Sequence, residues 1–238
     1  MNTRGGFTSY GQDIGILMLD TRFPRVAGDI GNARTFPFPV RYLTVEGASP
    51  ERVVVEQEPA LLEPFVEAAK SLERAGVKAI TTSCGFLAMF QRELAAAVSV
   101  PLFTSSLLQV PFLYALFGRR GKAGILTARA ASLGARHFDA CGLLSMPLAV
   151  AGMDRSPEFT RVFLSAGSAE TVLDYDRAER ELCEAARDLV AREPTIGFLV
   201  LECTNMPPFR EAIRKACGRP VFDIVTLTEY VHAGLLID

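Results

Sequence analysis

Residues 77–85 read Val-Lys-Ala-Ile-Thr-Thr-Ser-Cys-Gly, and residues 197–205 read Gly-Phe-Leu-Val-Leu-Glu-Cys-Thr-Asn. Each stretch begins with an apolar run, which is typical of a buried strand, and ends in small polar residues around a cysteine. The separation between these cysteines, Cys84 and Cys203, equals the separation between Pro101 and Pro220. The two stretches therefore predict equivalent positions in two copies of one structural unit.

The same alternation continues along the rest of the chain. Residues 14–18 (Ile-Gly-Ile-Leu-Met) resemble residues 123–127 (Ala-Gly-Ile-Leu-Thr), and the helical stretch 67–72 resembles 184–189. Strands that alternate with helices form mostly parallel sheets with helices on both faces. We expect strands at 14–19, 40–45, 52–56, 77–82, 100–104, 123–127, 197–202 and 220–222, and helices at 58–75, 86–97, from 105 onward and around 184–189.

These repeats predict an α/β protein of two pseudo-symmetric lobes, each a mostly parallel sheet flanked by helices, with an active-site cleft between them. The N-terminal lobe is expected to cover residues 1–118 and the C-terminal lobe residues 119–238. The last strand and helix, about residues 220–238, belong to the second copy but could pack back on the N-terminal lobe.

Charge and hydropathy narrow the class of protein. The 238 residues include 25 Lys and Arg against 27 Asp and Glu, for a formal net charge of −2. This balance argues against nucleic acid, since a phosphate-binding surface needs a clustered basic excess. No apolar run reaches the ~20 residues of a membrane-spanning helix, and residues 1–13 lack the pattern of a signal peptide. We therefore expect a cytoplasmic protein without nucleic-acid or membrane partners, whose cysteines are free thiols.

Cys84 and Cys203 each follow a predicted strand and precede a predicted helix. Ligands of parallel α/β sheets bind at this edge, where helix N-termini present free N–H groups and lower the pKa of a thiol. Two thiols on opposite sides of one carbon suit inversion without a cofactor, because one thiolate removes the α-proton and the other thiol protonates the opposite face. The developing enolate needs polar groups, and the strand ends offer Asp20, Ser83, Thr127, Thr204 and Asn205.

Other chemical interpretations are weaker. No Cys-x-x-Cys or His-x-x-x-His spacing indicates a metal site, and residues 118–122 lack the pattern of a phosphate-binding loop and are interpreted as a turn. His137 and His232 are expected on helices away from the cysteines, although a Cys–His hydrolase stays open, because its partners need only meet in space. A buried cysteine is usually a small hydrophobe, and this interpretation applies to Cys141, Cys183 and Cys217.

The motifs Thr82-Ser83-Cys84-Gly85 and Glu202-Cys203-Thr204-Asn205 resemble those of the cofactor-independent aspartate/glutamate racemase superfamily. That superfamily includes glutamate racemase, hydantoin racemase, maleate isomerase and arylmalonate decarboxylase. The opening stretch Gly15–Thr21 and the strand Gly124–Thr127 also fit, so the resemblance covers roughly residues 14–236.

The resemblance implies Cys84 and Cys203 as the acid–base pair, with Asp20 as a polar neighbour of the first thiol. It implies no metal or cofactor. Glutamate racemase has Asn-Thr after the first cysteine and His after the second Cys-Thr pair, whereas this chain has Gly85-Phe86 and Asn205. Both departures remove groups used on an amino acid, and Phe86 predicts a less polar pocket. The residues implied in substrate binding are Asp20, Ser83, Gly85, Phe86, Thr127, Thr204 and Asn205.

The segment from Thr21 to Pro39 is predicted to be a long loop at the mouth of the cleft, because its prolines and glycines exclude a regular helix over most of its length. Such a loop can exclude water from the site and select the substrate. Its arginines could clamp a second carboxylate or could simply be solvated. The arginines in question are Arg22, Arg25 and Arg34, with Arg41 just beyond the loop.

These observations predict an isomerase, namely a cofactor-independent racemase or epimerase of a small carboxylate-bearing compound such as an amino acid or a derivative. A maleate-isomerase-like or arylmalonate-decarboxylase-like enzyme with the same thiols is an alternative, although a second cysteine disfavours a one-thiol decarboxylase. A small-molecule-binding protein without turnover is another alternative. The sequence leaves open the substrate, its preferred hand and the oligomeric state, with a homo-oligomer among the options.

Overall fold

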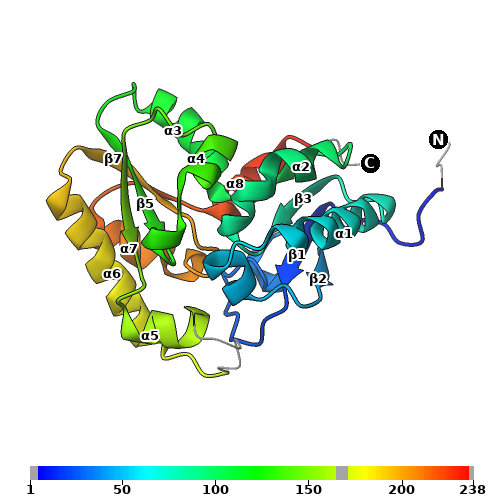
Figure 1. Cartoon of the computed structure of the whole chain (residues 1–238), viewed down its shortest axis with the longest axis horizontal. Coiled ribbons are helices and arrows are strands. Elements are labelled where there is room, and N and C mark those ends of the chain that lie inside the picture. Colours follow the sequence, from blue (N-terminus) through cyan, green and yellow to red (C-terminus); the bar gives the residue numbers. More distant parts are fainter. Residues whose placement is uncertain (1–4, 165–170, 236–238) are drawn as a thin grey trace.

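The computed structural model describes residues 5–164 and 171–235, which form two four-stranded parallel sheets flanked by helices (Figure 1). The strand order is β2-β1-β3-β4 in the first sheet and β6-β5-β7-β8 in the second. The second order is the first repeated with every strand number raised by four. The predicted α/β architecture of two similar halves is therefore confirmed.

The strands are β1 (Ile14–Leu19), β2 (Val40–Val45), β3 (Ala79–Thr82), β4 (Leu102–Phe103), β5 (Lys122–Thr127), β6 (Leu148–Gly152), β7 (Ile196–Leu201) and β8 (Val221–Phe222). The α-helices are α1 (Leu62–Arg74), α2 (Gln91–Ala96), α3 (Val110–Leu116), α4 (Ala135–Ala140), α5 (Pro157–Phe159), α6 (Tyr175–Arg192), α7 (Arg210–Cys217) and α8 (Ile224–Ala233). Short 3₁₀ turns lie at Ala33–Thr35, Pro59–Leu61, Gly85–Phe90, Ser106–Gln109, Ala130–Ser132 and Pro207–Phe209, and π-helical turns at Glu51–Val55 and Thr160–Leu164.

The second strand in the order of each sheet, β1 or β5, is an inner strand with a parallel neighbour on each side. All six residues of β1 are buried, and its parallel neighbours are β2 and β3, with Ile14 opposite Val40 and Ala79. In the second sheet β5 lies between β6 and β7 in the same way. β3 and β7 are therefore equivalent strands, and the chain continues from each of them into a cysteine.

The helices follow the apolar periodicity of the sequence. In α1 the buried residues are Phe65, Ala69 and Leu72, and the chain turns away at Gly76, whose φ of +89° is a left-handed conformation that favours glycine. In α6 the side chain of Asp174 caps the first turn by accepting a hydrogen bond from the N–H of Arg177. The helical spacing of apolar residues thus predicted α1 correctly, whereas the resemblance of 184–189 to 67–72 located only the second half of α6.

The strand expected at 52–56 is wrong. Glu51–Val55 forms a π-helical turn, closed by a hydrogen bond from the N–H of Glu56 to the carbonyl of Glu51. The adjacent residues Val53 and Val54 are both buried, which a strand with one solvated face cannot achieve. Burial of neighbouring side chains here outweighs the strand propensity of valine.

The C-terminal segment is shared between the two halves. β8 pairs with β7 in the second sheet, whereas Ile224 and Val225 of α8 pack in a cluster with Ile14 and Ile16 of the first sheet. Figure 1 shows α8, in red, beside the first half. The division of the chain near residue 118 stays a prediction. Within the described residues, no helix is long and apolar enough to span a membrane.

Two glycines allow a test of how tightly the second sheet is built. Gly121 and Gly142 have φ values of +70° and +72°, so alanine is strained at either position. A Cβ on Gly121 would overlap the carbonyl oxygen of Thr195 at the start of β7, whereas a Cβ on Gly142 would meet open space. We expect Gly142→Ala to lower the free energy of unfolding by about 1 kcal/mol and Gly121→Ala by about 3 kcal/mol or more. Urea denaturation measures both, and equal losses would contradict the predicted contact.

Candidate active site

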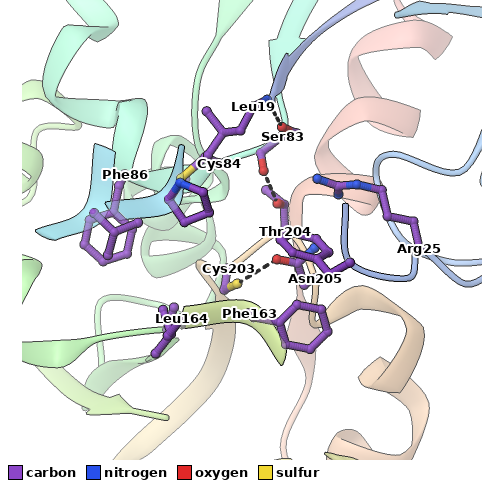
Figure 2. Close-up of a pocket in the computed structure, with 15 residues that line it drawn as sticks. Leu19, Arg25, Ser83, Cys84, Phe86, Phe163, Leu164, Cys203, Thr204 and Asn205 are labelled. Atoms are coloured by element: carbon purple, nitrogen blue, oxygen red, sulfur yellow. Dashed lines mark hydrogen bonds between the residues drawn. The ribbon is translucent and has the colours of Figure 1, made fainter. Parts of the chain in front are cut away.

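Cys84 and Cys203 line one small pocket from opposite halves of the protein (Figure 2). Cys84 follows the end of β3 and Cys203 the end of β7, and their exposed fractions are only 8% and 9%. The equivalence of β3 and β7 explains the meeting, because the duplicated sheets face each other with their carboxyl ends. The two thiols that the sequence singled out are therefore brought together in space.

The rest of the pocket wall is mostly apolar. Its volume is about 30 Å³, and the polar side chains on it are few. Apolar walls around a small number of polar groups are typical of small-molecule sites. Besides the two cysteines, the pocket is lined by Leu19, Phe23, Arg25, Pro50, Val54, Ser83, Gly85, Phe86, Ala128, Phe163, Leu164, Thr204 and Asn205.

Two hydroxyl groups join the loops that carry the cysteines. The Ser83 hydroxyl accepts a hydrogen bond of 2.9 Å from the N–H of Leu19, which ties the end of β3 to β1. The Thr204 hydroxyl donates a bond of 2.6 Å to the carbonyl oxygen of Ser83, which ties the second cysteine loop to the first. Both bonds are buried, so Ser83 and Thr204 fix the position of one thiol relative to the other.

Arg25 enters the pocket wall from the long loop after β1. Its guanidinium forms an ion pair of 2.7 Å with Asp29, and the two side chains are only 12% and 3% exposed. The other carboxylate oxygen of Asp29 accepts a hydrogen bond of 2.8 Å from the Asn205 side chain. The Cys203 thiol in turn lies 3.6 Å from the Asn205 amide oxygen. This chain of contacts connects the second thiol to Asp29 and Arg25, whereas the charge of Arg25 lowers the pKa of the first thiol, Cys84. Figure 2 shows Arg25 directed toward Thr204 and Asn205.

The expected lowering of the thiol pKa values is wrong for this site. The N–H groups of Phe86 and Leu87 do lower the pKa of Cys84, but burial and the charge of Glu202 outweigh them and raise it to about 12. The pKa of Cys203 is also raised well above its usual value, mainly by burial and then by Glu202. Both thiols are therefore protonated at neutral pH in the ligand-free protein.

Glu202 is a buried carboxyl group that the sequence analysis missed. It is 0% exposed, and Oε2 accepts a hydrogen bond of 2.6 Å from the Thr127 hydroxyl, while Oε1 has no hydrogen-bond partner among the described residues. Burial raises the pKa of Glu202 to about 7, against the opposing effect of the Thr127 bond. The available signal was an acidic residue at the end of an apolar strand, directly before Cys203, since glutamate is almost never fully buried without a reason.

The remaining residues expected in substrate binding divide into two groups. Two of them do not line the pocket: Asp20 forms an ion pair of 2.8 Å with the exposed Arg22, and Thr127 is buried behind the site, on Glu202. Among the arginines of the loop, Arg25 lines the pocket and Arg34 is exposed. The expected residues that do line the pocket are Ser83, Gly85, Phe86, Thr204 and Asn205.

The two histidines lie in different surroundings. His232 stacks on Phe38 at 3.6 Å and lies 3.3 Å from the Asp13 carboxylate, away from the pocket. His137 was expected far from the cysteines, yet its ring packs edge-on against the pocket residue Phe86, with centroids 5.3 Å apart. It does not itself line the pocket. In the part of the chain that the structure describes, no group of three or more His, Cys, Asp or Glu side chains could hold a metal ion.

Known proteins with related sequences fall into one family. The family model described as Asp/Glu/hydantoin racemase matches residues 49–228. A protein named dimethylsulfoniopropionate lyase from Durusdinium sp. clade D is 30% identical over 94% of this chain and 75% of its own length. Dimethylsulfoniopropionate lyases 3 and 5 from Emiliania huxleyi are 29% and 31% identical over 94% and 93% of this chain. The matches span only 60% and 45% of those two proteins.

Solved structures with the same fold are more distant in sequence. Allantoin racemase from Klebsiella pneumoniae superposes with a TM-score of 0.62 at 13% identity, over 95% of this chain and 91% of that one. Unliganded arylmalonate decarboxylase gives 0.55 at 16% identity, over 93% and 91% of the two chains. Glutamate racemase from Bacillus anthracis gives 0.56 at 17%, over 95% and 84%. These similarities establish the fold alone.

The burial of Glu202 predicts how stability depends on pH. An unfolded glutamate titrates near 4.5, whereas Glu202 in the folded protein titrates at about 7. Between these values the folded state binds more protons than the unfolded state, so the free energy of unfolding falls as the pH rises, by about 3 kcal/mol in total. This contribution is constant below pH 4.5 and above pH 7. We expect the free energy of unfolding of Glu202→Gln, measured by urea denaturation between pH 4 and 8, to lack this decline. If the free energies of the two proteins changed in parallel with pH, a raised pKa of Glu202 would be contradicted.

Proposed function

The chain belongs to the Asp/Glu/hydantoin racemase family, and from that premise we propose that it is a cofactor-independent lyase that eliminates dimethyl sulfide from dimethylsulfoniopropionate. The observation that carries the proposal is the pair of thiols in one pocket, because a racemase and this lyase share their first step. In both, a base removes a proton from the carbon next to a carboxylate. The names of the related sequences favour the lyase over the isomerase expected from the sequence.

The elimination balances without an external reagent. A cysteine thiolate takes the α-proton, and the electron pair of the broken C–H bond forms the new C=C bond. The bond between the β-carbon and the sulfonium sulfur breaks, and its electron pair leaves with sulfur. The products are neutral dimethyl sulfide and acrylate, and the proton stays on the thiol until solvent removes it. One base is sufficient for this reaction.

The side chains on the pocket wall suit the two charges of such a substrate, although the pocket, at about 30 Å³, has to widen to admit it. Arg25 is the cation on the pocket wall, and a guanidinium that already donates to Asp29 still has N–H groups for a carboxylate. The opposite charge, a sulfonium, is weakly hydrated and is attracted to aromatic faces. Phe86 and Phe163 line the pocket and can take that role, whereas the ring of Phe23 already lies under the Arg25 guanidinium, whose Cζ is 4.7 Å from the ring centroid.

Racemisation of a small carboxylate is the second candidate. The observation in its favour is that the thiols come from equivalent strands of a duplicated sheet and share one pocket, which suits proton transfer on two faces of a carbon. A maleate-isomerase-like or decarboxylase-like reaction, and ligand binding without turnover, are distinguished from both candidates by the products.

The first test is product formation by the two thiols. We expect the purified protein to release dimethyl sulfide, measured by gas chromatography, and acrylate, measured by NMR, from dimethylsulfoniopropionate. Loss of a catalytic acid or base costs about 10²- to 10⁴-fold in rate, so whichever of Cys84→Ser and Cys203→Ser removes the base should be at least 100-fold slower. Cys183→Ser is the matched control, because Cys183 lies on α6 and does not line the pocket. Exchange of the α-proton with deuterated water and inversion of a chiral carboxylate, without dimethyl sulfide, would instead support the racemase.

The second test concerns the carboxylate. Loss of a hydrogen bond to a charged group costs about 1.5–3 kcal/mol, so Arg25→Ala should lower kcat/KM by roughly 10- to 100-fold, mainly through KM. Arg25→Lys should recover part of the loss because it keeps the charge. Arg22→Ala is the matched control on the same loop, since Arg22 is exposed and pairs with Asp20 outside the pocket. Equal effects of Arg22→Ala and Arg25→Ala would contradict a role for Arg25 in binding substrate.

A further inference from the structure

Glu202 directly precedes Cys203, its side chain lies against the first cysteine loop, and the elimination itself does not use it. We propose that Glu202 accepts the proton that a reacting thiol gives up, so that the buried site carries one negative charge instead of two when the thiolate forms. The proposal rests on the proposed role of Cys84 and Cys203 as the reacting thiols. Glu202 does not line the pocket, so it acts on the substrate only through the thiols.

The position of the carboxyl group supports this role. Glu202 directly precedes Cys203, and its side chain lies against Gly85, the residue that directly follows Cys84. A Cβ on Gly85 would overlap both Oε1 and the carbonyl oxygen of Glu202, so only glycine at this position leaves room for the carboxyl group. Oε1, the oxygen on this side, has no hydrogen-bond partner among the described residues, whereas Oε2 is engaged by Thr127. An unengaged, buried carboxyl oxygen therefore lies beside the first cysteine loop and next in sequence to the second cysteine.

The charges around Glu202 make a second anion costly. Its negative charge raises the pKa of three thiols, those of Cys84, Cys203 and Cys141, the last at the end of α4. Among the other charged groups near the thiols, Arg25 lowers the pKa of Cys84 and Asp29 raises that of Cys203. Burial lowers the pKa of His137, which packs on Phe86, so His137 does not supply a positive charge at neutral pH. A thiolate beside a carboxylate would place two buried charges of the same sign together.

The step conserves charge. The S–H bond of a cysteine breaks and leaves its electron pair on sulfur, while Glu202 gains a proton as an O–H bond. No thiol lies within hydrogen-bond distance of Oε1 among the described residues, so the proton passes between the two groups by way of solvent. The net charge of the pair is −1 before and after the transfer. In the proposed elimination the thiolate then takes the α-proton of the substrate, which leaves a neutral thiol and a neutral carboxylic acid. Ionisation of Glu202 to solvent releases the one proton that the reaction produces and restores the starting state.

Shared protonation has a signature in the pH dependence of thiol reactivity. At low pH both groups are protonated, and the thiolate fraction rises tenfold with each pH unit. Above the pH at which the pair has lost one proton, the remaining proton is either on the thiol or on Glu202. The ratio of these two states, and with it the thiolate fraction, does not depend on pH. It therefore stays constant until a second proton leaves. Glutamine cannot share a proton, so a Glu202→Gln protein should show no such plateau.

Alkylation by iodoacetamide measures this without any substrate, because the thiolate is the reacting form. Rates at each cysteine are obtained between pH 5.5 and 9.5 by mass spectrometry of the digested protein. We expect the rates at Cys84 and Cys203 to level off near pH 7 in the wild type and to keep rising in Glu202→Gln, which becomes roughly 100-fold faster by pH 9. Cys183 is the internal control, because no effect of Glu202 on its pKa is present, and its rates should agree in the two proteins.

Parallel pH profiles at Cys84 and Cys203 in the two proteins would overturn the proposal. A second variant covers the case in which Glu202→Gln does not fold. The Thr127 hydrogen bond holds the pKa of Glu202 down, so Thr127→Val should move the start of the plateau to higher pH, and an unmoved plateau would also overturn the proposal. A plateau in a protein that releases no dimethyl sulfide would refute the lyase and leave proton sharing intact.

Discussion

The contact between the carboxyl ends of the two sheets determines where Cys84 and Cys203 lie relative to each other. Buried hydrogen bonds cross it: the Thr204 hydroxyl donates to the carbonyl of Ser83, and the Ser106 hydroxyl donates to the carbonyl of Leu201 at the end of β7. Buried polar groups need such partners, so the two halves can meet only in an arrangement that provides them. That arrangement also faces Cys84 toward Cys203. The positions of the two thiols therefore follow from the hydrogen bonds that join the strand ends of the two similar sheets.

Most of the fold and part of the site could be predicted from the sequence, because both follow from local patterns. The apolar run of β1 and the helical spacing in α1 need no knowledge of distant residues, and the equal spacing of the two cysteine motifs needs only a comparison of the halves. The prediction of a strand at 52–56 was wrong because the burial of Val53 and Val54 is decided by tertiary packing. β6 was missed because its residues, Leu-Ala-Val-Ala-Gly at 148–152, include no polar side chain at the half-buried positions, so the sequence shows no alternation there.

The parts of the site that could not be predicted depend on contacts between distant residues. Arg25 could not be separated from Arg22 and Arg34 until its pairing with Asp29 was known, since all three belong to one loop. The pKa values of the thiols were expected in the wrong direction for a related reason. A helix N-terminus is visible in the sequence, but the depth of burial is not, and desolvation is the larger of the two effects at Cys84.

The duplication does not make the two thiols chemically equal. Cys203 lies 3.6 Å from the Asn205 amide oxygen, and the charge of Asp29 raises its pKa. At Cys84, in contrast, the charge of Arg25 lowers the pKa. Inversion of a carbon requires a similar base on each face, whereas an elimination requires one base and a position for the leaving group. A pocket in which a cation acts on one thiol and an anion on the other, with aromatic rings on its walls, has the asymmetry that the proposed elimination needs, and this is the physical reason to place the lyase ahead of the racemase.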